Sequence, residues 1–204
     1  DGRWARWELR DYNRIIDYET GSSRHTAQQR AGLDPDKVGG CGAVPGAAAR
    51  PQQSAISANS PWLQQLQIWL TPSGFIRLAR DNNATVETQT AAGRTFNVVT
   101  FAVARGNDTY RMKGYFNPEN MVERIETWLD DPVFGDMLVE AEFSGYRNFD
   151  GLRFPARILH KQGGLGIFEL AVDKVVPNTT ASTAPPQAAG GRGGAGGGGG
   201  GGGG

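Results

Sequence analysis

The stretch that decides the fold is IETWLDDPVFGDMLVEAEFSGYRNFDGLRFPARILH, residues 125–160. Within it, MLVEAEF (137–143) alternates apolar and acidic side chains. A repeat of two residues is typical of a strand with one buried face and one wet face. The same alternation recurs in LRFPARI (152–158) and in IFELAVDKVV (167–176). These segments, joined by short turns, predict a sheet of antiparallel strands.

Earlier segments extend the predicted sheet toward the N-terminus. Residues 95–104 (TFNVVTFAVA) and 109–116 (TYRMKGYF) are rich in β-branched and aromatic residues and are separated by the turn signal RGND. Residues 120–129 (NMVERIETWL) fit the spacing of a helix as well as that of a strand, and we favour a strand because strand-like segments lie on both sides. Residues 3–19 predict one or two further strands, followed by a turn signal at 21–23 (GSS).

One helix is predicted, over residues 72–82. Thr71 is suited to cap it and Pro72 suits its first position. Gly74 weakens the helix by about 1 kcal/mol relative to Ala. The fold class is therefore α+β, mainly β: a curved antiparallel sheet whose apolar face is covered by one or two helices and by long loops.

The composition divides the chain of 204 residues into two parts. Residues 1–178 suffice for one domain with a sizeable core, and 30–55, rich in Gly, Ala, Pro and Gln, predict a long loop within it. Residues 179–204 are an Ala-, Pro- and Gly-rich segment that has almost no apolar surface to bury, so we expect a disordered linker or tail. The single cysteine, Cys41, lies in the predicted loop and is interpreted as a free thiol.

The charge balance argues against nucleic acid as a partner. The chain carries 21 basic and 21 acidic residues, and no basic block stands out. A protein that binds by displacing counterions from phosphates is expected to be more basic. No stretch reaches the roughly 20 apolar residues that a transmembrane helix needs, so we predict no transmembrane segment.

The charged residues of the opening stretch raise the question of catalysis. Asp130, Asp131, Asp136 and His160 could in principle form a metal or catalytic cluster. However, the acids fall in DDPVFGD, where Asp, Pro and Gly favour a turn between strands. A weak cation site and a catalytic role remain less favoured alternatives. The other histidine, His25, is far away in sequence, and no hydrolase, phosphate-loop or dinucleotide motif occurs, so we predict no catalytic, cofactor or metal residue in this chain.

The aromatic side chains have two readings. The five tryptophans (Trp4, Trp7, Trp62, Trp69 and Trp128) could line a ligand cavity, but aromatic residues more often form plain core. The residues that we predict to form either the core or a hydrophobic ligand site are Trp69, Phe75, Ile76, Trp128, Phe143, Phe154 and Phe168.

One family resemblance covers most of residues 4–178. The run RIETWLDDPVFGDMLVEAEFSGYRNFDGLRFPARILHKQGG, followed by a strand and VVPN, resembles the N-terminal domain that precedes the metallo-β-lactamase-fold domain in secreted bacterial metallo-hydrolases. The pieces DYNRIIDYETGSSR and QIWLTPSGFIRLA match the same domain. Such domains are similar in shape to the LolA and LolB lipoprotein carriers, which implies a strongly curved half-barrel with helices on its concave face.

The resemblance implies a function without carrying over a catalytic site. The zinc ligands of such relatives lie downstream, in a His-x-His-x-Asp-His motif that this sequence lacks. We therefore expect a non-catalytic accessory domain that packs against or feeds a C-terminal catalytic domain, with zinc only in that domain. The resemblance also implies a periplasmic or secreted location. The alternative is a stand-alone carrier of a lipid or other hydrophobic ligand.

Overall fold

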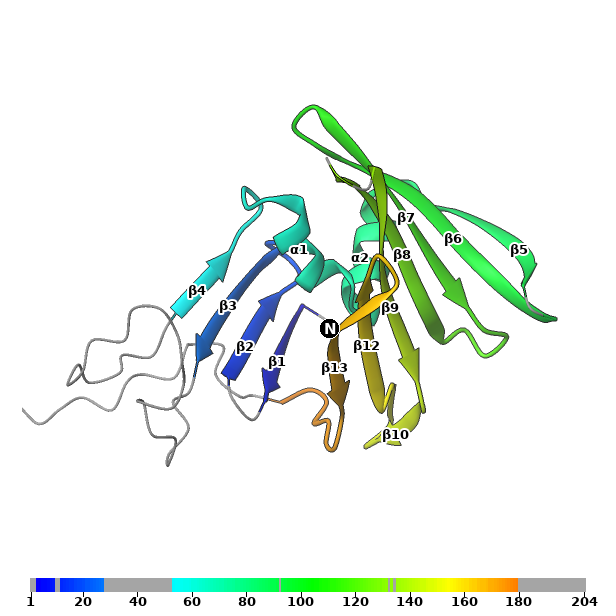
Figure 1. Ribbon diagram of the computed structural model, residues 1–204. Helices are drawn as coiled ribbons and strands as arrows, with labels where there is room; N and C mark the ends of the chain where they lie inside the picture. The colour runs from blue at the N-terminus through cyan, green and yellow to red at the C-terminus, as the bar shows by residue number, and fades with distance from the viewer. Residues whose placement is uncertain are drawn as a thin grey trace, which may run out of the picture.

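The computed structural model describes residues 3–9, 12–27, 53–91, 93–131, 133 and 135–179. These residues form a mainly β structure in which two antiparallel sheets flank a pair of helices (Figure 1). The predicted tail beyond Thr179 and Cys41 both lie outside the described residues. None of the helices in the described part of the chain is long and apolar enough to cross a membrane.

The N-terminal sheet has four strands in chain order. They are β1 (Trp4–Glu8), β2 (Tyr12–Asp17), β3 (Ser22–Ala27) and β4 (Gln53–Ile56). The first two confirm the strands predicted within residues 3–19, and the turn between β2 and β3 contains Gly21 at a φ of 62°. Most of the predicted loop 30–55 lies outside the described residues, but for 53–55 the prediction is wrong, because these residues pair with β3.

The second sheet has seven strands in the order β13-β12-β9-β8-β7-β6-β5. Their bounds are β5 (Thr85–Ala91), β6 (Arg94–Arg105), β7 (Asp108–Phe116), β8 (Val122–Asp131), β9 (Gly135–Ser144), β12 (Arg157–Gln162) and β13 (Leu165–Ala171). A short hairpin of β10 (Arg147–Phe149) and β11 (Leu152–Phe154) is inserted between β9 and β12. Every pairing is antiparallel.

Several predicted strands need correction. The ambiguous segment 120–129 is a strand, β8, as predicted. The predicted strand 152–158 is broken in two, because Pro155 has no N–H to donate to a sheet. The predicted strand 167–176 ends at Ala171. Strand β5 was not predicted at all, since its sequence TVETQTA shows no apolar alternation.

Two helices follow one another between the sheets, α1 (Trp62–Trp69) and α2 (Pro72–Asp81). Helix α2 confirms the predicted helix, and the Thr71 hydroxyl accepts a hydrogen bond from the N–H of Gly74, as a capping residue should. Gly74 also has a packing role, because a Cβ at this position would lie 2.3 Å from the backbone oxygen of Ile68.

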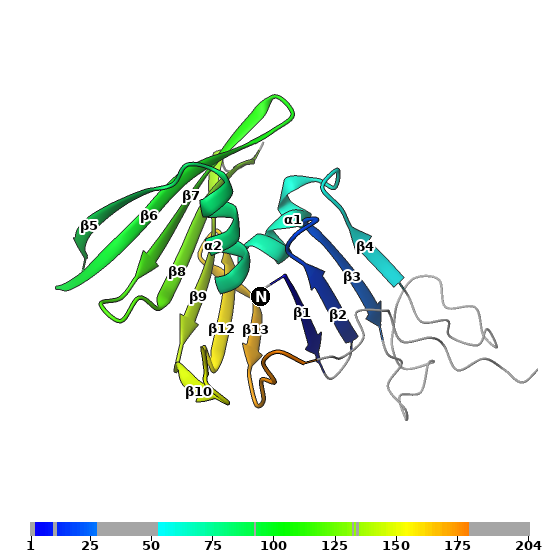
Figure 2. The ribbon, with the colours of Figure 1, turned by 180° about the vertical axis from the view of Figure 1, so that it is seen from behind.

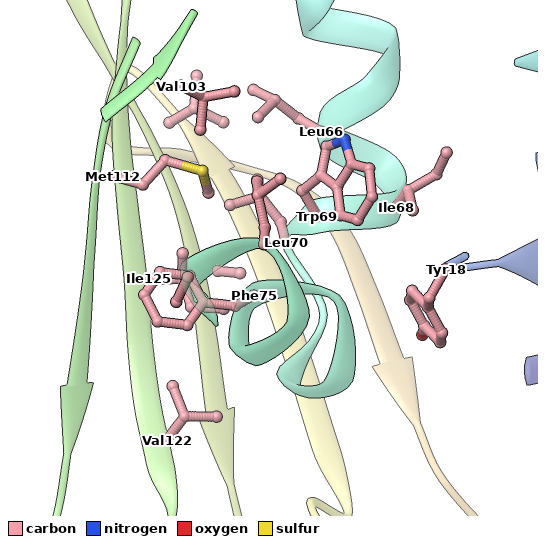
Figure 3. Packing of buried hydrophobic residues seen from close by; sticks show 14 of the residues in the cluster. Tyr18, Leu66, Ile68, Trp69, Leu70, Phe75, Val103, Met112, Val122 and Ile125 are labelled. Atoms are coloured by element: carbon pink, nitrogen blue, oxygen red, sulfur yellow. The ribbon is translucent and has the colours of Figure 1, made fainter. Parts of the chain in front are cut away.

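The main core lies between the helices and the seven-stranded sheet. The Phe75 ring is fully buried and packs against the rings of Phe101 and Phe116, with centroids 5.2 and 6.1 Å away. Gly114 on β7 leaves the space for this ring, since a Cβ there would lie 2.3 Å from it. Figure 3 shows Met112 and Ile125 of the sheet facing the helices, with Tyr18, from the turn after β2, on the far side.

The helices therefore join the two sheets into one structure. Buried Tyr18, in the turn after β2, accepts a hydrogen bond from Thr71 between the helices. Neither sheet curls strongly on its own. The mainly antiparallel β class is confirmed, and the strongly curved half-barrel stays a prediction.

Candidate functional site

A cleft opens between the two sheets, where the free edges of β1 and β13 lie next to each other (Figure 2). Its volume is about 1610 Å³. Its walls are β1, the first turn of α2, the β10–β11 hairpin and the segment 170–179 that continues from β13. A cleft of this size exceeds the roughly 300–1,000 Å³ of ordinary small-molecule pockets, so it has room for a large ligand or a peptide segment.

Several apolar side chains that line the cleft are exposed to solvent. Ile76 on α2 is 53% exposed, Leu152 on β11 is 41% exposed and Val176 is 52% exposed. Trp4 and Trp7 on β1 line the same space and are half-buried. Apolar residues scattered singly over a surface are ordinary, but several facing one cleft indicate a surface that is covered by something else.

The cleft lining carries equal numbers of acidic and basic residues. Its charged lining residues are Arg3, Arg6, Glu8, Asp17, Glu19, Arg24, Asp150, Arg153, Asp173 and Lys174. Five are basic and five acidic, and Arg6 pairs with Glu8 at 3.1 Å. The charged residues of the lining therefore balance one another.

The structure divides the predicted core or ligand residues into three groups. Trp69, Phe75 and Phe143 are buried in the core. Ile76 and Phe154 line the cleft. Trp128 and Phe168 are half-buried elsewhere: the Arg111 guanidinium lies 4.3 Å from the centre of the Trp128 ring, and Phe168 packs against His160.

A buried polar junction lies beside the core, where β2, β3 and α1 meet. The Arg14 guanidinium donates through Nε to His25 Nε2 at 2.6 Å and through a terminal nitrogen to the Gln67 side chain at 2.6 Å. Arg14 is only 8% exposed, so these bonds hold a cation inside the protein. Because His25 Nε2 accepts a hydrogen bond, the imidazole is neutral in this arrangement.

The second histidine, His160, stands on β12 on the other side of the junction. Its Nε2 atom is buried and makes no hydrogen bond within the described residues. Burial, aided by the positive charge of Arg14, lowers the pKa of His160 to about 4. Burial and the same cation lower the pKa of His25 to about 4. Both rings are therefore uncharged at neutral pH, and the junction is structural in character.

The opening stretch forms a hairpin between β8 and β9, as predicted, but its three carboxylates lie at the strand ends rather than in the turn. Asp130 and Asp136 pair directly across the β8–β9 hairpin, and Asp131 pairs with Gly135, whose φ is 70°. The structure does not bring His160 to them, since it lies on β12 with its ring among the buried residues. Within the described ranges, no three His, Cys, Asp or Glu side chains are grouped as metal ligands would be.

Comparisons with protein-family models, with curated proteins and with solved structures find no match to this chain. The cleft itself was not predicted from the sequence. Its walls come from opposite ends of the chain, β1 and the segment 170–179, and no local pattern indicates that these will meet.

Proposed function

We propose that this chain is a non-catalytic accessory domain of a secreted or periplasmic metallo-β-lactamase-fold hydrolase, and that it receives its partner domain in the cleft between the sheets. The observation that carries the proposal is the position of the segment 172–179. This segment forms a wall of the cleft, with Val175 and Val176 among its lining residues. A domain that follows this segment through the predicted linker would be held close to the cleft, which raises its effective concentration there.

The sequence resemblance supports the same proposal. The residues that carry it most strongly, 124–164, build β8, β9, the β10–β11 hairpin and β12. One part of the cleft wall, the β10–β11 hairpin, therefore comes from this segment, including Leu152 and Phe154. The edge strands β1 and β13 of the two sheets lie next to each other (Figure 1).

The first test is to read the intact coding region past Gly204. If a His-x-His-x-Asp-His stretch follows, the encoded domain is produced separately and its binding to this chain is measured by calorimetry. We expect Ile76→Lys and Leu152→Lys to weaken binding at least tenfold, because each places a charge among the apolar residues of the cleft. The matched control is Leu63→Lys, at a residue on α1 that is 47% exposed and does not line the cleft. A stop codon, or binding that ignores the cleft variants, contradicts the proposal.

A second candidate is a carrier of a hydrophobic ligand, favoured by the aromatic and aliphatic walls of the cleft. A carrier of this kind could hold its ligand between the sheet and its helix, but the space there is filled by the Phe75 ring and its neighbours. A carried ligand would instead occupy the cleft beside Trp4, Trp7 and Phe154. Uptake of the uncharged probe N-phenyl-1-naphthylamine tests this: the carrier requires saturable fluorescence enhancement that Ile76→Lys removes, and an absence of uptake rejects it.

A further inference from the structure

Strand β5 forms an open edge of the seven-stranded sheet. It pairs with β6 on one side, from Thr85 opposite Thr100 to Ala91 opposite Arg94, and no strand of the described residues lies on its other side. Its side chains from Thr85 to Thr90 are exposed or half-buried, and Val86 is 64% exposed. Figures 1 and 2 place β5 at the end of the molecule away from the N-terminal sheet. A row of backbone N–H and C=O groups is therefore available at this edge.

The edge lacks the usual features that prevent pairing. Natural edge strands are kept apart by Lys, by Pro, by bulges or by being very short. The β5 sequence TVETQTA has seven residues, no Lys, no Pro and a single charge, Glu87. Its pairing with β6 runs without a register shift. By contrast, β4 has four residues, and the pairing of β13 with β12 is shifted between His160 and Lys161.

We propose that β5 pairs antiparallel with β5 of a second copy of this chain, about a two-fold axis that passes through Thr88. The strand is self-complementary in this register. Thr88 then faces Thr88 of the second copy, Val86 faces Thr90, and Glu87 faces Gln89. Threonine pairs and β-branched pairs stabilise antiparallel strands, and a carboxylate opposite an amide allows a hydrogen bond. A register centred on Glu87 would instead place two carboxylates directly opposite each other, which is unfavourable.

Side-chain direction supports the same register. Val86, Thr88 and Thr90 lie on one face of β5, whereas Glu87 and Gln89 lie on the other, because residues alternate along a strand. Residues that face each other across an antiparallel pair share a face. The two-fold pairing therefore brings β-branched side chains together on one face and a Glu–Gln pair, made twice by symmetry, on the other.

The interface is small, which sets the expected affinity. Seven residues of strand pairing cover less than the roughly 1,200–2,000 Å² of a standard interface. We expect a dissociation constant on the order of 10–100 µM, so the dimer forms at high protein concentration. The mass of 21.9 kDa per chain makes monomer and dimer easy to distinguish.

Sedimentation equilibrium on the full chain, from about 1 to 500 µM, tests the pairing. Gln89→Lys places a cation opposite Glu87 twice, and Gln89→Glu places a like charge there twice. Two cross-strand pairs of ordinary strength change the dissociation constant by roughly 2- to 30-fold, downward for Gln89→Lys and upward for Gln89→Glu. The control Ala55→Lys adds a charge at an exposed residue of β4 and leaves the constant unchanged.

Disulfide cross-linking tests the register directly. In a Cys41→Ser background, Thr88→Cys places two thiols at the axis, where facing Cα atoms in a strand pair lie within disulfide range. We expect covalent dimers on mild oxidation. Thr90→Cys faces Val86 rather than itself, so this variant should form no covalent dimer. A chain that stays monomeric at 500 µM, a dimer that ignores the charge at residue 89, or open-ended assembly each overturns the proposal.

Discussion

Two physical effects predict opposite changes in stability when Gly74 is replaced by Ala. Helix propensity alone predicts that Ala stabilises α2 by up to about 1 kcal/mol. The packing predicts the reverse, because the new Cβ would lie 2.3 Å from the Ile68 oxygen and 2.7 Å from the Thr71 hydroxyl oxygen. The nearest atom belongs to the backbone of α1, so neither a rotamer change nor a small local shift can relieve the contact.

The magnitude follows from the contacts that must give way. Overpacking a filled site costs about 1–3 kcal/mol. Displacing the Thr71 cap from the N–H of residue 74 costs about 1 kcal/mol more. With the propensity gain subtracted, Gly74→Ala should lower the free energy of unfolding by about 2 kcal/mol, or the melting temperature by roughly 4–8 °C.

Urea unfolding, followed by circular dichroism and tryptophan fluorescence, measures this change. The matched control is Ser73→Ala, at the neighbouring exposed position of the same turn. It should change the free energy of unfolding by no more than about 0.5 kcal/mol, as surface substitutions usually do. An unchanged slope with urea shows that the fold is retained. If Gly74→Ala is as stable as the parent chain, the close approach of α2 to α1 is refuted.

Three further perturbations test other parts of the structure. The free energy of unfolding should fall as the pH drops from about 6.5 toward 4, because the unfolded chain binds protons at histidines whose pKa is lowered to about 4 in the fold. His160→Gln should reduce the dependence of this free energy on pH by about 1 kcal/mol per pH unit, measured by unfolding between pH 5 and 7. Thr71→Ala should cost about 1–2 kcal/mol in urea unfolding because it removes the cap and the bond to Tyr18, whereas Thr71→Ser, which keeps the hydroxyl, should cost less than half as much. Trp128→Ala should cost about 1 kcal/mol through its contact with Arg111 and leave uptake of the uncharged probe unchanged, because Trp128 does not line the cleft; altered uptake would contradict this placement.

The sequence predicts the fold where the apolar pattern is local. Residues 137–143 and 120–129 are strands, and α2 begins at its predicted cap and first proline. Helix α1 was missed because it has only 8 residues and no side-chain cap. It is stabilised by burial of Trp62, Leu66 and Trp69 against the rest of the protein. Tertiary packing of this kind overrides weak local signals.

The cleft depends on a different kind of information. Ile76 was predicted together with Phe75 as a core or ligand-site residue, and the two differ because one residue turns a helix by about 100°. That rotation carries Phe75 into the core and Ile76 into the cleft. Neither segment alone predicts that β1 and β13 will line the same cleft. Their positions are set only when the helices pack against both sheets.

The strand order has a consequence for how the chain folds. Within each sheet, nearly every strand pairs with the strand that precedes or follows it, and the exception, β9 with β12, skips only a short hairpin. Most strand pairings are therefore between neighbouring strands in the sequence, which lowers the chain entropy lost in forming each sheet and favours rapid folding for a β protein. The long-range step is the closure of the two sheets onto α1 and α2. Substitutions at the buried helix positions are thus expected to act on the union of the two sheets rather than on the formation of either sheet.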